Sequence, residues 1–449
     1  MIKKKNLVLL IVFIFLSNCS LDDKSGIWDG TKKEKKRILE LEEKQKNIKN
    51  INKIYSSEDI YNKEINLTRK LNISEAKKNL SWEESNLNKE NNLGNIYFNG
   101  LNYLFLKKKI GKNKFSISKV ISSPLIIENN IILSDNTGTI FNIDQNGKIN
   151  WKKNIYKKIY KKVFKNLVFS VYNKKVYIAD NIGFVYSLDL ISGKVDWIKN
   201  HGVPLKSNIK VFQDKIFLIN QDNRIFCLNA NNGSKIWDIR SVSSFIKEQN
   251  FLSSAITNQK EVIFITSSGD LMMVSTDNGR IFWTVNTLES TLSHASDFFT
   301  SSEIVVSNDI IIFSAKSSIF SFNIATGYMN WKNNVSSVGA PIVDGENIFI
   351  NTKNGYFVIL DKENGEIISS TNILNILKKG KRNTSITGFI MGSGKIYSTT
   401  SNGFLIVSSS ISGKVENFKK IGDPITSSPV ISDGKLYILT QDSRLFVFN

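Results

Sequence analysis

Cysteine and histidine are nearly absent from this sequence, and their scarcity excludes several classes of protein. The 449 residues include only two cysteines, Cys19 and Cys227, and two histidines, His201 and His294. A chain with so few cysteines is not a disulfide-stapled scaffold. Neither histidine lies at ligand spacing from a Cys, Asp or Glu, which argues against His-ligated metal catalysis and against a Ser-His-Asp triad. We therefore interpret both histidines as ordinary loop residues.

Arginine is also scarce, which bears on the meaning of the strong positive charge. The formal net charge is +20, but only seven of the 60 basic residues are arginine and the other 53 are lysine. Surfaces that read bases or clamp phosphates usually depend on arginine, so the composition disfavours nucleic-acid binding. A diffuse lysine surface is instead attracted weakly to anionic lipid or other acidic surfaces.

Long hydrophobic runs are missing, apart from one near the amino terminus. Residues 7–16 form an apolar stretch of ten that follows a lysine cluster, which is too short to span about 30 Å of hydrocarbon and is typical of a signal peptide over residues 1–18. The following stretch Leu16-Ser17-Asn18-Cys19 resembles the lipobox of bacterial lipoproteins, in which the cysteine is diacylated and becomes the first mature residue. We expect lipid attachment at Cys19, and the alternative is an ordinary secretory signal that contains a cysteine.

A lipid on Cys19 would anchor the protein to a membrane and leave Cys227 as its single thiol. Several acyl chains, at ~0.8 kcal/mol for each buried methylene, hold a protein on a membrane more firmly than one chain does. Ser20 stands where a signal for retention in the inner membrane usually has Asp, so we expect sorting to the outer membrane. Cys227 lies in an apolar, strand-like stretch, 225–228, and is predicted to be a small buried core residue.

Residues 19–78 are predicted to form a flexible tether between the lipid and the body of the protein. The segment is dense in Lys, Glu and Asn, as in 32–37 and 42–44, and has few apolar residues at regular spacing. Such a composition does not bury enough apolar surface to fold by itself. We expect a lysine-rich spacer that is at most transiently helical.

One pattern recurs from residue 120 onward and decides the fold class. Each copy has two short apolar strands joined by a Gly- or Asn-containing turn, then a polar turn closed by Gly, and five of the copies have a Trp four residues later. The turn glycines are Gly147, Gly193, Gly233, Gly279, Gly327, Gly365 and Gly413, and their spacings of 46, 40, 46, 48, 38 and 48 average about 44 residues. Such a period is typical of the four-stranded blade of a β-propeller.

Each part of the repeat has a local physical reason. The strands are rich in Ile, Val, Phe and Tyr, which suit a pleated, half-buried surface, and the polar turn supplies a glycine for positive φ. The tryptophan that ends each outer strand is predicted to pack its ring against the neighbouring blade. Five copies have it, as Trp151, Trp197, Trp237, Trp283 and Trp331, whereas the sixth and seventh copies have Ser369 and Asn417 in its place.

The last repeat is incomplete, and this predicts how the ring closes. An eighth copy begins near 426 and reaches only the Asp/Asn position at 449, before its turn and outer strand. A toroid completes such a blade with a strand from the other end of the chain, and residues 80–86 offer a strand with the expected Trp82. We therefore predict an all-β, eight-bladed propeller over residues 79–449, rather than an open β-solenoid. The WD40 type of blade is disfavoured because its Gly-His partner is missing.

The repeat resembles that of the pyrroloquinoline-quinone-like (PQQ-like) propeller family. In that family the outer half of a blade reads roughly Ala-Leu-Asp-x-x-x-Gly-x-x-x-Trp, and five copies here keep the spacing from Gly to Trp. A lipoprotein signal, a short tether and one eight-bladed propeller are together most similar to the BamB family of lipoproteins. The resemblance implies a non-enzymatic scaffold without a cofactor, anchored at the periplasmic face of the outer membrane. It would act as a monomer within a hetero-complex, bind the barrel-inserting subunit BamA and unfolded barrel proteins, and aid barrel assembly.

Two other functions are compatible with this fold. A PQQ-dependent alcohol or sugar dehydrogenase would need adjacent cysteines, a Glu/Asn/Asp calcium set and a catalytic Asp in the central funnel, and the sequence has no adjacent cysteines. A periplasmic adaptor for another envelope complex stays open, because a fold does not determine its partner.

The resemblance also implies where the partner binds. In the BamB family the contact surface involves loops between the third, fourth and fifth blades, which match 244–249 and 292–297 here. Lys247 stands where an arginine is expected, and Asp297 is what remains of an acidic pair. A lysine keeps the charge but lacks the bidentate fork of arginine. Lys247 and Asp297 are our candidate partner-binding residues, and the alternative is that both are ordinary solvated loop residues.

Overall fold

The computed structural model describes residues 36, 61–101, 103–112, 122–160, 162–241, 252–287, 300–377 and 384–449. The predicted signal peptide, Cys19 and most of the predicted tether lie outside these residues. Within them the elements are strands, apart from the short 3₁₀ helices η1 (Lys158–Tyr160) and η2 (Ile373–Ile376). No helix of the described part is long and apolar enough to cross a membrane.

The described strands form eight four-stranded sheets. Chain order gives, for the first four, β2 (Leu125–Ile127), β3 (Asn130–Ser134), β4 (Thr139–Ile143), β5 (Ile149–Asn154); β6 (Leu167–Tyr172), β7 (Lys175–Asp180), β8 (Phe184–Asp189), β9 (Val195–Asn200); β10 (Lys210–Phe212), β11 (Lys215–Ile219), β12 (Arg224–Asn229), β13 (Lys235–Arg240); and β14 (Ser254–Ile256), β15 (Glu261–Ile265), β16 (Asp270–Ser275), β17 (Ile281–Asn286).

The second half of the chain repeats this arrangement. Its sheets are β18 (Val305–Ser307), β19 (Ile310–Ala315), β20 (Ser318–Asn323), β21 (Met329–Asn333); β22 (Ile342–Asp344), β23 (Asn347–Asn351), β24 (Tyr356–Asp361), β25 (Ile367–Asn372); β26 (Ile386–Gly392), β27 (Lys395–Thr400), β28 (Phe404–Ser409), β29 (Val415–Lys420); and β30 (Val430–Ser432), β31 (Lys435–Leu439), β32 (Arg444–Phe448) with β1 (Leu104–Lys109).

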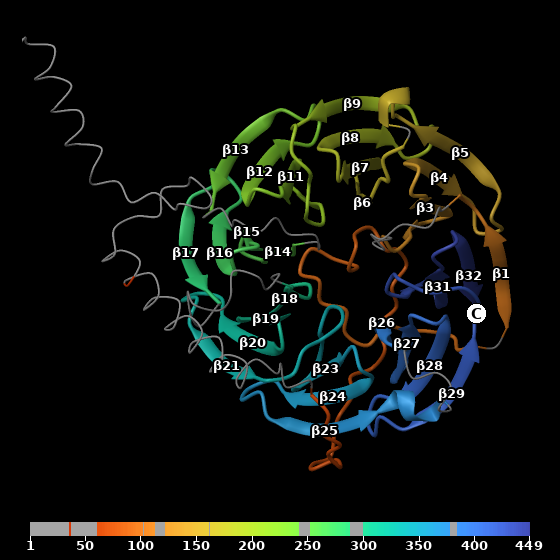
Figure 1. Cartoon of the computed structure of the whole chain (residues 1–449), viewed down its shortest axis with the longest axis vertical. Coiled ribbons are helices and arrows are strands. Elements are labelled where there is room, and N and C mark those ends of the chain that lie inside the picture. Colours follow the sequence, from red (N-terminus) through yellow and green to blue (C-terminus); the bar gives the residue numbers. More distant parts are fainter. Residues whose placement is uncertain are drawn as a thin grey trace, which may run out of the picture. The chain divides into compact units, whose positions relative to one another are not determined.

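The sheets are arranged around a common centre as the blades of a propeller, which confirms the predicted all-β, eight-bladed fold (Figure 1). We number the blades 1 to 8 in chain order, so β2 to β5 form blade 1. Because neighbouring strands of a blade are antiparallel, its first and third turns, such as 173–174 and 190–193, lie at one end of the ring. We call this the turn end. The opposite end, which we call the link end, holds the second turn of each blade, such as 181–183, and the links between blades, such as 201–205.

The residue pattern explains which strands are inner and which are outer. The middle strands of a blade are buried on both faces between neighbouring blades, and they are accordingly continuous apolar runs, as in 225–228 of β12. The outermost strands alternate between half-buried and exposed residues, as in β9 and β17. Cys227 is fully buried in β12, as predicted, and burial raises the pKa of its thiol to about 12.

The repeated tryptophans join consecutive blades, as the sequence predicted. The ring of Trp151 in blade 1 covers Gly193 in the polar turn of blade 2, where an added Cβ would lie 2.6 Å from the indole. Its Nε1 donates a hydrogen bond to the Leu190 carbonyl oxygen at 2.9 Å. The same glycine contact and indole hydrogen bond recur at Trp197, Trp237, Trp283 and Trp331. Each of these residues therefore fastens its outer strand to the next blade.

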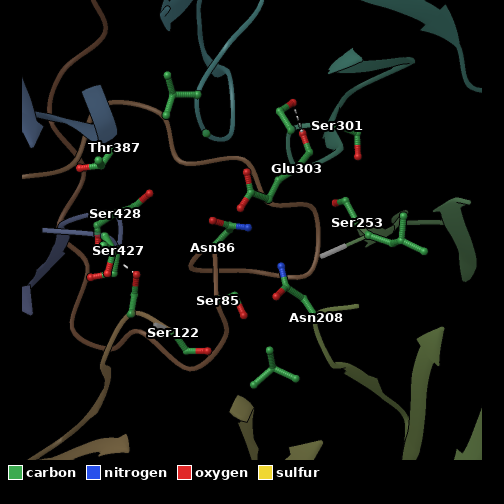
Figure 2. A pocket seen from close by; sticks show the side chains of 17 residues that line it. Ser85, Asn86, Ser122, Asn208, Ser253, Ser301, Glu303, Thr387, Ser427 and Ser428 are labelled. Atoms are coloured by element: carbon green, nitrogen blue, oxygen red, sulfur yellow. Dashed lines mark hydrogen bonds between the residues drawn. The ribbon is translucent and has the colours of Figure 1, made fainter. Parts of the chain in front are cut away.

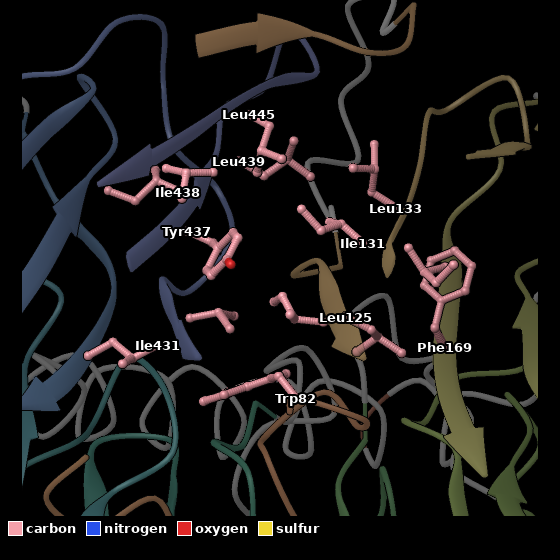
Figure 3. Close-up of a cluster of buried hydrophobic side chains, with 14 of the residues drawn as sticks. Trp82, Leu125, Ile131, Leu133, Phe169, Ile431, Tyr437, Ile438, Leu439 and Leu445 are labelled. Carbon is pink, nitrogen blue, oxygen red and sulfur yellow. The ribbon is translucent and has the colours of Figure 1, made fainter. Parts of the chain in front are cut away.

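An N-terminal strand closes the ring, as predicted, but the predicted position of that strand is wrong. β1 pairs with β32 and completes blade 8, so residues 104–109 take the place assigned to 80–86. The sequence Leu-Phe-Leu-Lys-Lys-Lys of β1 suits an outermost strand, because most of its side chains are exposed. Trp82 is only 2% exposed and instead packs inside the ring, where blades 8 and 1 meet (Figure 3).

Residues 61–72, which the sequence placed in the tether, lie along the outer edge of blade 6. Ile65 exchanges two backbone hydrogen bonds of 2.9 Å with Ser370 of β25, and the Thr68 amide donates to the Ile368 carbonyl oxygen. We call this segment the strap. The structure thus differs from the predicted boundary at residue 78, because backbone pairing along an open strand edge holds a segment whose composition alone would not fold it.

Candidate functional site

Residues 74–99 run around the inside of the ring at its turn end, and we call them the belt. Figure 1 shows this part of the chain as an orange trace across the centre of the propeller. The belt hydrogen-bonds to every blade; its partners, from blade 1 to blade 8, are Ile126, Val171, Lys210, Ile256, Val306, Asp344, Met391 and Gly434. One continuous segment is therefore fixed to all eight blades.

A buried ion pair holds the belt to blade 3. The Lys210 ammonium lies 2.5 Å from the Glu84 carboxylate, and the Lys210 side chain is 1% exposed. The same ammonium donates to the Asn88 carbonyl oxygen at 2.8 Å. A charge buried to this extent needs such partners, because desolvation is costly for an unpaired ion.

An asparagine ties the belt to the next two blades. Asn91 has positive φ and is fully buried, and its side-chain amide donates to the carbonyl oxygens of Ser254 and Ile304 at 2.9 and 2.7 Å. Asparagine tolerates the left-handed conformation better than most residues, so the same residue makes the turn and both bonds.

A polar cavity of about 210 Å³ lies in the centre of the ring against the belt. Figure 2 shows its lining of serine, threonine and asparagine side chains from around the ring, with Ser85 and Asn86 contributed by the belt. Glu303 is the single carboxylate in this lining. Burial raises the pKa of the Glu303 carboxyl, while the Asn86 amide and the Lys210 ammonium act in the opposite direction.

Pyrroloquinoline quinone does not fit the residues of this cavity. The cofactor is a flat quinone with three carboxylates, which calls for cationic partners and a flat apolar surface. The lining has neither a Lys, Arg or His nor an aromatic side chain. Across the part of the chain that the structure describes, no three His, Cys, Asp or Glu side chains gather into a metal site either. The hydroxyl-rich cavity is suited instead to water or a small polar molecule.

The predicted partner-binding residues lie outside the described residues. Lys247 falls in the range 242–251 and Asp297 in the range 288–299. The strand ends that flank them, at the end of β13 and the start of β14, and at the end of β17 and the start of β18, all belong to the link end. Partner binding by Lys247 and Asp297 therefore stays a prediction.

The belt is the main element of this site that sequence reasoning missed. Trp82 was singled out, but as part of an outer strand. The residues around it show neither strand nor helix periodicity, so their binding to the ring depends on partners spread from blade 1 to blade 8. The sequence did contain a signal for a turn within the belt, because Asn91 is part of a polar Asn-Asn pair beside Leu93-Gly94.

Comparison with known proteins places this architecture in a family. Residues 136–371, slightly more than half of the chain, match the family described as "Outer membrane protein assembly factor BamB". A curated BamB from Moranella endobia (strain PCIT) is 22% identical over 261 residues, which cover 53% of this chain and 62% of that protein. The match thus spans less than two thirds of that relative's length.

Solved structures share the fold at lower identity. The crystal structure of BamB from Moraxella catarrhalis has a TM-score of 0.63 at 13% identity and covers 77% of this chain and 100% of its own. A quinohemoprotein alcohol dehydrogenase from Comamonas testosteroni has a TM-score of 0.63 at 12% identity, covering 83% of this chain and 81% of its own. The fold alone therefore does not separate assembly factors from dehydrogenases. The matched repeats do identify the family: this chain belongs to the PQQ-like β-propellers described as outer membrane protein assembly factor BamB.

Proposed function

We propose that this protein is a non-enzymatic scaffold of the outer-membrane β-barrel assembly machinery. The observation that carries the proposal is the family match over residues 136–371, within a ring whose central cavity does not fit the quinone cofactor of the dehydrogenases. The protein would bind the barrel-inserting subunit BamA through Lys247 and Asp297 and aid the insertion of barrel proteins. A lipid on Cys19 would hold it at the periplasmic face of the outer membrane.

The test is capture of partners from detergent-extracted membranes by the tagged, full-length protein. We expect recovery of the large barrel-inserting subunit, and we expect the double variant Lys247→Glu with Asp297→Lys to recover about tenfold less, since reversing interfacial charges costs more than 1 kcal/mol. A matched control reverses one exposed cation and one exposed anion at the turn end of the ring, as Lys194→Glu with Glu363→Lys. If the Lys247→Glu, Asp297→Lys variant captures the subunit as fully as the control variant does, the assigned contact residues are refuted.

The scaffold proposal itself has a separate outcome. If the wild-type protein recovers a different envelope protein in place of the barrel-inserting subunit, the protein is an adaptor for another complex. The anchor is tested by Cys19→Ala, which we expect to abolish labelling by radioactive palmitate and to release the protein from the membrane fraction.

A further inference from the structure

A second concavity, of about 390 Å³, lies on blade 3 and is separate from the central cavity. Its lining includes His201 from the link that follows β9, Arg224 from β12, and Lys235 and Arg240 from β13. These four side chains approach one surface hollow from three segments of the chain. The hollow therefore concentrates nitrogen donors in one place.

Two arginines face each other across this blade. Arg224 and Arg240 are direct partners in the antiparallel register of β12 and β13. Like charges directly opposite each other destabilise a sheet, and Asp238 relieves this only at Arg224, with which it pairs. Only seven of the 60 basic residues of the chain are arginine, and two of the seven occupy this one pair of positions. Arginine differs from lysine in having a planar fork that matches an oxyanion.

The carboxylates of the hollow leave part of its positive charge unbalanced. Asp238 accepts from Arg224 Nε and from Lys235 Nζ, both at 2.5 Å. Asp238 lies beside the hollow, and Asp222 is the carboxylate of its lining. Two carboxylates thus face three permanent cations, and among the described residues Arg240 forms no ion pair. The Arg240 side chain is exposed and its guanidinium donors are available to a ligand.

His201 lies in the same hollow, within reach of its cations. Its ring packs against Phe226, with 5.2 Å between ring centroids, and its Nε2 is buried without a hydrogen-bond partner in the described structure. Burial lowers the pKa of His201, and the cations Lys235, Arg224 and Lys199 lower it further. An anion that enters the hollow would oppose this lowering, so the pKa of His201 would report its binding.

We propose that this hollow on blade 3 is a binding site for phosphate, either free or as the monoester headgroup of a phospholipid. A carboxylate offers two oxygens, whereas the Arg240 fork, the Lys235 ammonium and the remaining nitrogens of Arg224 supply more donors than two oxygens accept. A phosphate has three or four oxygens and a second negative charge, which matches both the donor number and the unbalanced cation. The site requires no particular function of the ring and holds whether or not the scaffold proposal is correct.

The experiment titrates the purified full-length protein with inorganic phosphate at constant ionic strength. Selective labelling of the two histidine rings, with a His294→Gln variant to assign them, lets NMR follow His201 alone. We expect phosphate to raise the pKa of His201 in a saturable way, and Arg240→Gln to weaken binding about tenfold or more, as loss of a charge-assisted hydrogen bond implies. The control is Arg280→Gln, which removes an exposed arginine of the neighbouring blade and should leave binding unchanged.

The other arms decide the source and the chemistry of the ligand. Vesicles of phosphatidylcholine with phosphatidic acid test the headgroup, and binding that free phosphate displaces and Arg240→Gln abolishes assigns the site to lipid. Binding of free phosphate with no response to these vesicles assigns it to the soluble ion. The proposal is overturned if phosphate leaves His201 unchanged, if Arg240→Gln binds like wild type, or if succinate binds as tightly as phosphate.

Discussion

The ring contains two kinds of junction between neighbouring blades. The five junctions from blade 1 to blade 6 each have a tryptophan that covers a turn glycine of the next blade. The three junctions 6/7, 7/8 and 8/1 have none: Ser369 and Asn417 stand in the tryptophan position of blades 6 and 7, and β1 supplies Leu106 and Lys108 over Gly147. The repeat is thus strict over one arc of the ring and degenerate over the other.

The N-terminal segment compensates where the tryptophans are missing. Leu71 of the strap joins the core between blades 6 and 7. Phe98 of the belt packs edge-to-face on Tyr397 of blade 7 and pairs with Gly434 of blade 8. Trp82 enters the core where blades 8 and 1 meet. The three unfastened junctions therefore each gain an apolar side chain from residues 61–99, which makes this segment part of the folded ring.

Along blades 1 to 6, whose junctions have the tryptophans and which we call the fastened arc, the same belt binds through polar groups. The Glu84–Lys210 ion pair and the amide bonds of Asn91 hold it to blades 3, 4 and 5. Apolar contacts stabilise through burial, whereas buried ion pairs mainly penalise the loss of one partner. The two arcs should consequently respond differently to substitutions in the belt.

Removing the belt tryptophan should give the largest loss of stability. Trp82→Ala leaves a cavity in the core that blades 8 and 1 share, and we expect the free energy of unfolding to fall by about 4 kcal/mol. Trp197 is half-buried on the fastened arc, and Trp197→Ala should cost about 2 kcal/mol because less surface is lost. Chemical denaturation of both variants measures the difference. Equal losses would mean that the belt is no more important than an ordinary fastener.

Breaking the buried ion pair should have the next largest effect. Lys210→Met keeps the apolar stem but leaves Glu84 without its counter-ion, and we expect a loss of about 3 kcal/mol at neutral pH. The loss is limited because a buried carboxyl takes up a proton when its partner is removed. Adding Glu84→Gln should recover most of the stability, as a thermal-unfolding comparison of the single and double variants will show. A double variant no more stable than Lys210→Met would mean that the ammonium acts mainly through the Asn88 carbonyl.

The fold was predictable because its signals are local and repeated. The spacing of the seven turn glycines and the incomplete eighth copy indicate eight blades, and the Trp four residues after five of these glycines predicts packing on the neighbouring blade, as Trp151 does on Gly193. The burial of Cys227 follows in the same way from an apolar strand. These features need only one blade and its neighbour.

The belt and the closing strand were not predictable from local signals, for a physical reason. Residues 74–99 gain their stability from partners in every blade, some more than 300 residues away in the sequence, such as Gly434, and have no periodicity of their own. Residues 80–86 and β1 both resemble an outer strand, and the choice between them depends on whether Trp82 is buried in the core. The opposed Arg224 and Arg240 became visible only once the strand register was known.

The smallest expected effect comes from a matched pair of glycines, which tests the tryptophan contact between two blades. Gly365 and Gly394 have nearly the same φ, +73° and +74°, but a Cβ at Gly365 would overlap the Trp331 ring whereas one at Gly394 would meet nothing within 4 Å. Gly394→Ala should therefore cost only the backbone strain of about 1 kcal/mol. Gly365→Ala should cost about 2–3 kcal/mol, because the clash adds to that strain. Urea denaturation of the two variants isolates the fastener contribution, and equal losses would show that the Trp331 ring moves aside freely and does not fasten blade 5 to blade 6.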